Sequence, residues 1–402
     1  MVQAVSFLGL IVMLVLAWSI SNNKRLIPWR TVITGTLLQI IFALIILRTP
    51  LGKAFFIWLS DAVTVFLDFS DAGARFVFGE GFAEHLFAFK VLPTIIFFSS
   101  VITILYYLGI LQFIVKIFAK IMMKVMGTSG AESLASAVNV FVGQTEAPLL
   151  IRPYVPFLTQ SELMAVMVGG FSNIAGGVLA AYVSMGVDAG HLIASSVMSA
   201  PASLVMAKLA FPETEQSATA GTVTLEVERP WANVIDAAAE GATEGMKLAI
   251  NVAAMLIAFI GLVALLNAVL MKIGAMAGYP ALSLELILGF LLRPLAWVMG
   301  VPWKDSANVG ALLGIKTVLN EFVGYVRLQE MVQAGQLSER SRIIATYALC
   351  GFSNFSSIAI QIGGIGAMAP SRKADLARLG LKAMVAGSLA TFQTATIAGM
   401  LL

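Results

Sequence analysis

Charged residues are scarce in this chain of 402 residues, of which Asp, Glu, Lys and Arg make up only 12%. Hydrophobic residues make up 59% of the chain, and the mean hydropathy is +0.92. Soluble globular proteins carry about twice this share of charged residues. The formal net charge of +3 is too small to indicate a nucleic-acid partner. The composition therefore predicts a polytopic membrane protein that binds no nucleic acid.

Cysteine and histidine are almost absent as well. The single cysteine, Cys350, excludes an intrachain disulfide bond and a cysteine-based zinc site. The two histidines, His85 and His191, stand apart, and the sequence has no His-Glu-x-x-His motif of a metalloprotease. An intramembrane serine–histidine protease needs a histidine at depth, whereas His191 only begins a predicted span. We therefore do not expect an enzyme.

Long apolar runs are what the chain has in abundance. The first, at residues 2–21, lacks a basic n-region and a small-residue cleavage site, so it predicts a transmembrane helix and not a cleaved signal. Further spans are predicted at residues 29–47, 91–111, 164–185, 191–209, 248–270, 343–368 and 379–402. The expected fold is all-α, a polytopic membrane protein with about eight transmembrane helices.

Other apolar segments carry charges and are predicted to lie in the membrane interface. Residues 51–77 mix aromatic side chains with aspartates. Lys116, Lys120 and Lys124 recur at every fourth position, so they share one face of an amphipathic helix. A further amphipathic stretch is expected ahead of the span at 248–270.

Two apolar regions are interrupted by polar turns and predict re-entrant hairpins. In residues 127–160, two short apolar stretches flank the turn Gly-Gln-Thr-Glu-Ala-Pro at 143–148. Residues 284–324 contain the polar tip Asn320-Glu321. Irregular backbone at membrane depth is tolerated only where protein or a wet cavity covers it.

The tetrapeptide Gly-Phe-Ser-Asn occurs twice, at residues 170–173 and 351–354, each time inside a predicted span. A glycine and an asparagine at mid-membrane predict that one half-helix ends there and another begins. Half-helix N-termini present free N–H groups, and C-termini present free carbonyls. Two hairpin tips and two breaks can therefore bind a ligand with few charged side chains.

Counting the crossings predicts that the two halves are inverted repeats. A hairpin returns to its own side, and the broken and intact spans that follow it return together. The single crossing at 248–270 then delivers the second unit to the opposite face, which is typical of secondary transporters with a site at the midplane. Basic residues predict that two links are cytoplasmic and both termini external: Lys24, Arg25, Arg30, Arg372, Lys373 and Arg378.

The chain is expected to divide into N-terminal spans with an interfacial helix and scaffold (1–126), a first repeat (127–210), a loop with an interfacial helix and a scaffold span (211–280), and a second, inverted repeat (281–402).

A carboxylate at bilayer depth is costly and usually functional, so Glu146 and Glu321 at the hairpin tips are the leading site candidates. Their segments also carry uncharged polar residues, namely Asn139, Gln144, Thr145, Asn354, Ser356 and Ser357. Many uncharged hydrogen-bonding groups, two acids and few bases suit a neutral polyol-like or heterocyclic solute. The alternative is an elevator-type transporter of an amino acid or carboxylate, for which Arg152 or Lys316 would have to supply the cation.

Three strings resemble those of the concentrative nucleoside transporters: GQTEAPLLI (143–151), KTVLNEFVGYV (316–326) and GFSNFSSIAI (351–360). The resemblance covers the whole chain. It implies a symporter in the bacterial cytoplasmic (inner) membrane that imports nucleosides on a sodium or proton gradient. It also implies a homotrimer in the lipid bilayer, in which a mobile transport domain of each protomer makes an elevator-like movement.

The resemblance also implies roles for single residues. Nucleobase contacts would come from Gln144, Thr145 and Glu146, with Val178 nearby, and ribose contacts from Glu321, Asn354 and Ser357, with Phe352 flanking. A sodium ion would be bound by Asn139, the carbonyl of Val142, Asn173 and the carbonyl of Ile174. Asn173 stands where the family has a serine, and some members are thought to use protons. The choice between purines and pyrimidines stays open.

Overall fold

The computed structural model describes the backbone of residues 2–220, 230–276 and 278–402, and all their side chains except those of residues 83–87. Within these ranges the chain is helical without strands, which confirms the expected all-α class. The side chain of His85 lies outside the described part.

The N-terminal helices are α1 (Val2–Ser19), α2 (Trp29–Arg48), α3 (Pro50–Asp68), α4 (Ser70–Phe78), η1 (Glu80–His85), η2 (Leu86–Val91), α5 (Leu92–Tyr107) and α6 (Ile110–Met126). The first repeat contains α7 (Gly130–Val138), η3 (Ala147–Phe157), α8 (Gln160–Ser172), α9 (Gly176–Ser184) and α10 (Ala189–Ala210). After α11 (Val234–Met276), the second half contains α12 (Leu284–Val298), α13 (Ser306–Val318), α14 (Glu321–Gln333), α15 (Glu339–Leu349), α16 (Phe355–Met368), η4 (Pro370–Arg372) and α17 (Lys373–Leu401).

In the described residues, 8 helical segments are long and apolar enough to cross a membrane, which supports a polytopic membrane protein. They differ from the predicted spans in two places. Pro50–Phe78, expected in the interface, is also long and apolar enough to cross. The predicted span 343–368 is divided between α15 and α16, because the second Gly-Phe-Ser-Asn is not helical and interrupts it.

The predicted amphipathic stretch and span around 248–270 form one helix, α11, of 43 residues. Its sequence contains no proline, and two of its glycines, Gly241 and Gly245, serve packing instead of breaking the helix. A Cβ on Gly241 or Gly245 would come within about 2.8 Å of the α5 backbone. These glycines therefore let α5 and α11 pack closely.

The second hairpin begins later in the chain than predicted, since residues 284–324 were expected to form it. Residues 284–298 form the separate helix α12, which ends before Gly300 at a φ of +100°, a value that favours glycine. Its Gly289 packs against Gly310 of α13, where a Cβ on Gly310 would lie 2.9 Å from the Gly289 carbonyl oxygen. We call α7 with η3 hairpin 1, and α13 with α14 hairpin 2.

The two hairpins have their bases at opposite ends of α17. At its start, Arg372 donates hydrogen bonds to the carbonyl of Leu158, at the base of hairpin 1. Near its end, Gly399 accepts from Arg340, which also donates to Gly300 at the base of hairpin 2. The two repeats are therefore inverted relative to each other, as the count of crossings predicts.

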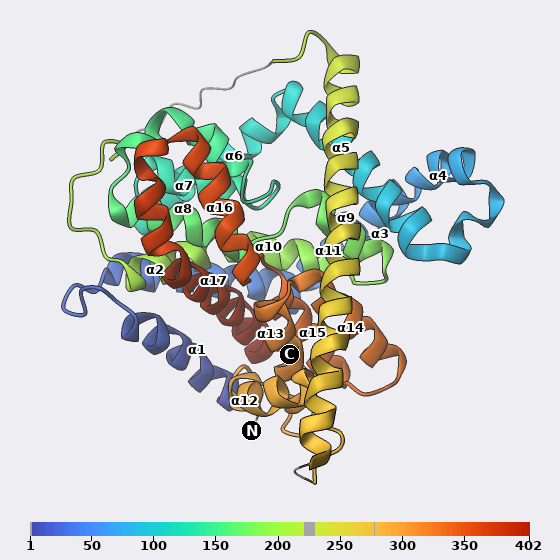
Figure 1. Ribbon diagram of the computed structural model, residues 1–402. Helices are drawn as coiled ribbons and strands as arrows, with labels where there is room; N and C mark the ends of the chain where they lie inside the picture. The colour runs from blue at the N-terminus through green and yellow to red at the C-terminus, as the bar shows by residue number, and fades with distance from the viewer. Residues whose placement is uncertain (1, 221–229, 277) are drawn as a thin grey trace.

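Two groups of helices form the site. Most residues of α8, α10 and α17 are buried, and together with α7, α9, η3 and α13–α16 these helices form what we call the bundle. By contrast, α5 and α11 pack along each other and α11 is mostly exposed; we call this pair the wall. Figure 1 shows α11 as a long rod running past the bundle.

Candidate functional site

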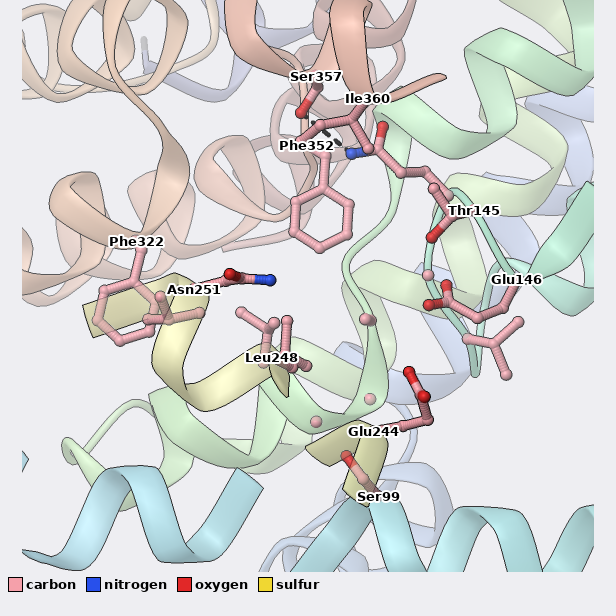
Figure 2. A pocket seen from close by; sticks show the side chains of 18 of the residues that line it. Ser99, Thr145, Glu146, Glu244, Leu248, Asn251, Phe322, Phe352, Ser357 and Ile360 are labelled. Carbon is pink, nitrogen blue, oxygen red and sulfur yellow. Dashed lines mark hydrogen bonds between the residues drawn. The ribbon is translucent and has the colours of Figure 1, made fainter. Parts of the chain in front are cut away.

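A cavity of about 590 Å³ lies between the bundle and the wall. It is lined by both hairpin tips, by both helix breaks and by one face each of α5 and α11. All the residues expected to bind substrate line it, namely Gln144, Thr145, Glu146, Val178, Glu321, Phe352, Asn354 and Ser357. Figure 2 shows several of these side chains around the open space. The two tips, at Glu146 and Glu321, are far apart in the sequence and share one cavity.

Glu321 is the buried acid of this cavity, with 4% of its surface exposed. Asn320 caps α14 by accepting from the Val323 N–H at 2.9 Å, which sets Glu321 in the first turn. The Glu321 carboxylate accepts from the Tyr182 hydroxyl at 3.1 Å and from the Asn354 amide at 3.2 Å. Among the described residues no lysine or arginine forms an ion pair with it. The carboxylate is therefore oriented by neutral donors and keeps its capacity to accept further hydrogen bonds.

The second break positions two more polar groups. Asn354 caps α16, because its side-chain oxygen accepts from the Ser357 N–H at 2.9 Å. The Ser357 hydroxyl accepts from the Gln144 amide at 3.1 Å, the dashed line in Figure 2. This bond connects the expected ribose-binding residues on α16 with the expected base-binding residues of hairpin 1.

Two polar partners were missed by the sequence reasoning. Gln361 donates to the Gln144 side chain at 3.0 Å and to the Met167 carbonyl at 3.1 Å, and so holds Gln144 in place. It lies one turn after Ser357, which was the available signal. Tyr182, one turn after Val178, holds Glu321.

Glu146 differs from Glu321 because its side chain is exposed in the cavity. It folds back over its own turn, where a Cβ on Gly143 would lie 2.3 Å from one carboxylate oxygen. The glycine at position 143 therefore makes room for this conformation.

Three of the four residues expected to bind sodium are buried and do not line the cavity, namely Asn139, Asn173 and Ile174. Asn139 and Asn173 are buried, and the Asn139 side-chain oxygen and both polar side-chain atoms of Asn173 have no hydrogen-bond partner in the described structure. Their segments are adjacent, since the Gly176 N–H donates to the Phe141 carbonyl at 3.2 Å. Buried polar atoms without partners are costly and call for a ligand. Of the four expected ligands, only Val142 also lines the cavity.

The two Gly-Phe-Ser-Asn breaks contact each other directly. The Ser353 hydroxyl donates to the Phe171 carbonyl at 2.7 Å, and the Phe352 N–H donates to the Asn173 carbonyl at 3.2 Å. The free backbone groups of one break are thus partly satisfied by the other. The segment expected to bind the ion is therefore hydrogen-bonded to the segment expected to bind the sugar.

The cations that a carboxylate transporter would need are elsewhere. Lys316 is fully buried in hairpin 2, where it donates to the Ala348 carbonyl at 2.8 Å and to the Thr391 hydroxyl at 3.0 Å. It does not line the cavity, and neither does Arg152. Lys247 on α11 lines the cavity, but it forms an ion pair with Glu244 at 2.6 Å. The site favours a neutral solute.

Comparison with known proteins accounts for nearly all of the chain. Family models described as "Na+ dependent nucleoside transporter N-terminus" and "C-terminus" match residues 8–81 and 191–399, and a "Nucleoside recognition" model matches residues 88–189. Solute carrier family 28 member 3 of Homo sapiens is 47% identical over 99% of this chain and 60% of its own length. An uncharacterized transporter of Haemophilus influenzae is 48% identical over 98% of this chain and 97% of its own length.

Several matched vertebrate proteins are longer, and the chain spans about 60% of their length. Among solved structures, CNTnw in an inward-facing substrate-bound state has a TM-score of 0.94 and 43% identity, covering 100% of this chain and 98% of that one. A CNTnw variant in an outward-facing state gives a TM-score of 0.94 and 42% identity, with the same coverage.

Proposed function

The chain belongs to the Na+-dependent, or concentrative, nucleoside transporter family, and from that premise we propose that it imports nucleosides together with sodium. It is an integral membrane transporter. We place it in the bacterial cytoplasmic membrane, which agrees with a relative from Haemophilus influenzae that it matches over nearly the full length. The proposed mechanism is symport by alternating access.

The observation that carries this proposal is the cavity shared by both hairpin tips and both helix breaks. Its buried acid is oriented by Tyr182 and Asn354 and can accept from a pair of sugar hydroxyls. The Gln144 amide, held by Gln361, can both donate and accept at the edge of a base. A neutral molecule with hydroxyls at one end and a heterocycle at the other matches this distribution of groups.

In the proposed complex, base contacts come from Gln144, Thr145, Glu146 and Val178, and ribose contacts come from Glu321, Asn354, Ser357 and Phe352. The hydrogen bond between Gln144 and Ser357 fits a base and a sugar bound side by side.

Sodium is proposed to bind to the oxygens of Asn139, Val142, Asn173 and Ile174. The buried amides of Asn139 and Asn173 without partners support this assignment. The ligand set consists of amides and carbonyls, and the described residues contain no cluster of His, Cys, Asp or Glu suited to a transition metal. Asn173 has an amide oxygen where the family has a hydroxyl, and this oxygen serves as the ligand.

Coupling follows from the shared backbone. Sodium bound between hairpin 1 and the first break orders the hairpin that carries Gln144. The Phe352 N–H donates a hydrogen bond to the Asn173 carbonyl in the same break, so ordering of this break also affects the proposed ribose-binding segment. Each ligand therefore raises the affinity for the other by the same factor.

An elevator-like movement of the bundle against the wall is the proposed route across the bilayer, and a homotrimer is the proposed assembly. Large exposed side chains such as Ile257, Leu265 and Met276 make α11 suited to contact lipid or another copy of the chain.

The proposal is tested with the purified protein in liposomes. We expect labelled uridine to accumulate when sodium is high outside, and unlabelled nucleosides to compete, whereas amino acids and dicarboxylates do not. Equal uptake in potassium medium with a pH gradient would assign the coupling to protons. Absence of uridine uptake under every gradient would overturn the proposed function.

A further inference from the structure

The long helix α11 carries one polar side chain where none is needed for folding. Between Lys247 and Asn267, residues 248–266 are apolar or glycine except for Asn251. An amide within a membrane span is unfavourable against lipid, so such residues usually face a partner or a wet cavity. Asn251 therefore requires an explanation that neither the family motifs nor the proposed binding residues supply.

The other amide of α11 shows what a structural role looks like. Asn267 donates to Glu285 at 3.0 Å and accepts from the Leu284 N–H at 2.8 Å, so it joins α11 to the start of α12. Asn251 has no side-chain hydrogen bond to any described residue. It is exposed, and it lines the cavity that contains Glu321 and Ser357. Figure 2 shows its amide pointing into the open space, from the side of α11.

The position of Asn251 along α11 is as informative as its direction. The α11 residues that line the cavity run from Glu244 to Leu256, and Asn251 itself lies in the N-terminal half of this helix, which extends to Met276. The proposed nucleoside ligands lie on the bundle, whereas Asn251 lies on the wall. A bundle that moves along the wall carries the nucleoside past Asn251 at one end of its travel only.

We propose that Asn251 is a nucleoside-binding residue of the wall, which hydrogen-bonds the solute while the bundle is at the N-terminal end of α11 and loses it at the other end. This rests on the proposed nucleoside transport. An amide both donates and accepts, so it can meet a sugar hydroxyl or the edge of a base. The solute is then held from both sides in one position of the bundle and from one side in the other.

The test compares Asn251→Leu with the full-length wild type in oriented membrane vesicles, measuring the KM for uridine from each side. Loss of one neutral hydrogen bond predicts a rise of about fivefold in the KM from the side where the N-terminus of α11 lies. From the opposite side the KM stays within about twofold, because Asn251 does not touch the solute there. A general packing defect would alter both sides alike.

Ile250→Leu, the preceding residue of α11, which is exposed and does not line the cavity, is the matched control and should leave both KM values unchanged. Asn251→Gln keeps the amide and should restore most of the loss. Deoxyuridines lacking single hydroxyls identify the group contacted, since Asn251→Leu adds no further loss for the analogue that lacks it. Asn251→Ala serves as a second variant should the leucine variant fold poorly.

A change below twofold from both sides, or an equal change from both, would overturn this inference while wild-type uridine transport upheld the proposed function. A wild type that carries no nucleoside in either direction would overturn the proposed function, and this inference with it.

Discussion

At the scale of residues, the site depends on hydrogen bonds made to a few buried groups. Glu321 accepts from a tyrosine and an asparagine on separate elements, and Gln144 is held by Gln361 and bonded to Ser357. Sequence reasoning predicted binding roles for Glu321 and Gln144, because a carboxylate and an amide at the tip of an apolar hairpin are unusual, and both residues line the cavity. It missed Gln361, since the partner of a buried amide is chosen by the segment packed against it.

Glu321→Gln tests the acid. Glutamine keeps the shape, but its amide presents one acceptor oxygen, and its NH2 group faces the donors of Tyr182 and Asn354. Each hydrogen bond to a charged group contributes about 1.5–3 kcal/mol, so we expect uridine affinity to fall at least roughly tenfold and uptake to be lost. Equilibrium binding to the purified variant measures this. The control is Glu330→Gln on the same helix, an exposed residue paired with Arg327, and wild-type affinity in Glu321→Gln would contradict the ribose role.

At the scale of elements, the breaks and hairpins follow from local sequence, but their packing does not. Both Gly-Phe-Ser-Asn motifs end a helix as predicted. What the motif alone does not reveal is that the two breaks hydrogen-bond each other, or that Gly170 is where hairpin 1 rests on α8. A Cβ on Gly170 would lie 2.8 Å from the Gln361 amide and 2.9 Å from the Gln144 Cβ.

Gly170→Ala therefore displaces hairpin 1 from α8 and moves Gln144. We expect weaker uridine binding, by roughly tenfold or more, since the Gln144 contacts to Ser357 and Gln361 are disturbed together. Gly363→Ala on α16 is the matched control, because a Cβ there meets nothing within 4 Å. That variant should bind normally and gain slightly in helix stability. Equal binding by both variants would argue against the close approach.

At the scale of the whole molecule, function is proposed to depend on the bundle and the wall remaining separate bodies. Their contact is close at α9 and α5, where a Cβ on Gly177 would lie 3.2 Å from the Ser99 hydroxyl. The predicted division at residues 126, 210 and 280 stays a prediction. Within the third part, the expected amphipathic stretch and the span at 248–270 form one continuous helix, so the change in composition between them does not mark a structural break.

A reversible cross-link tests the movement. A Cβ on Gly177 would lie 3.2 Å from the hydroxyl oxygen of Ser99, so Ser99→Cys with Gly177→Cys places two cysteines close enough to be tested for a disulfide bond. The native Cys350 is buried and should not interfere. We expect oxidation to stop uridine transport, to leave uridine binding in place, and to be reversed by a reductant. Either single variant should be insensitive to oxidation. Full transport by the oxidised, cross-linked protein would exclude a movement of the bundle along the wall.

The sequence by itself determined the class, the helix breaks, the hairpin tips and the inversion of the repeats. Each follows from local chemistry: apolar run length, glycine and asparagine inside a run, acids at depth, and the parity of crossings. Only the tertiary structure decided that α11 is continuous, that α12 stands outside hairpin 2, that Tyr182 and Gln361 hold Glu321 and Gln144 in place, and that Asn251 lines the cavity. These depend on which faces pack together, and packing partners far apart in the chain leave no periodic signal in the sequence.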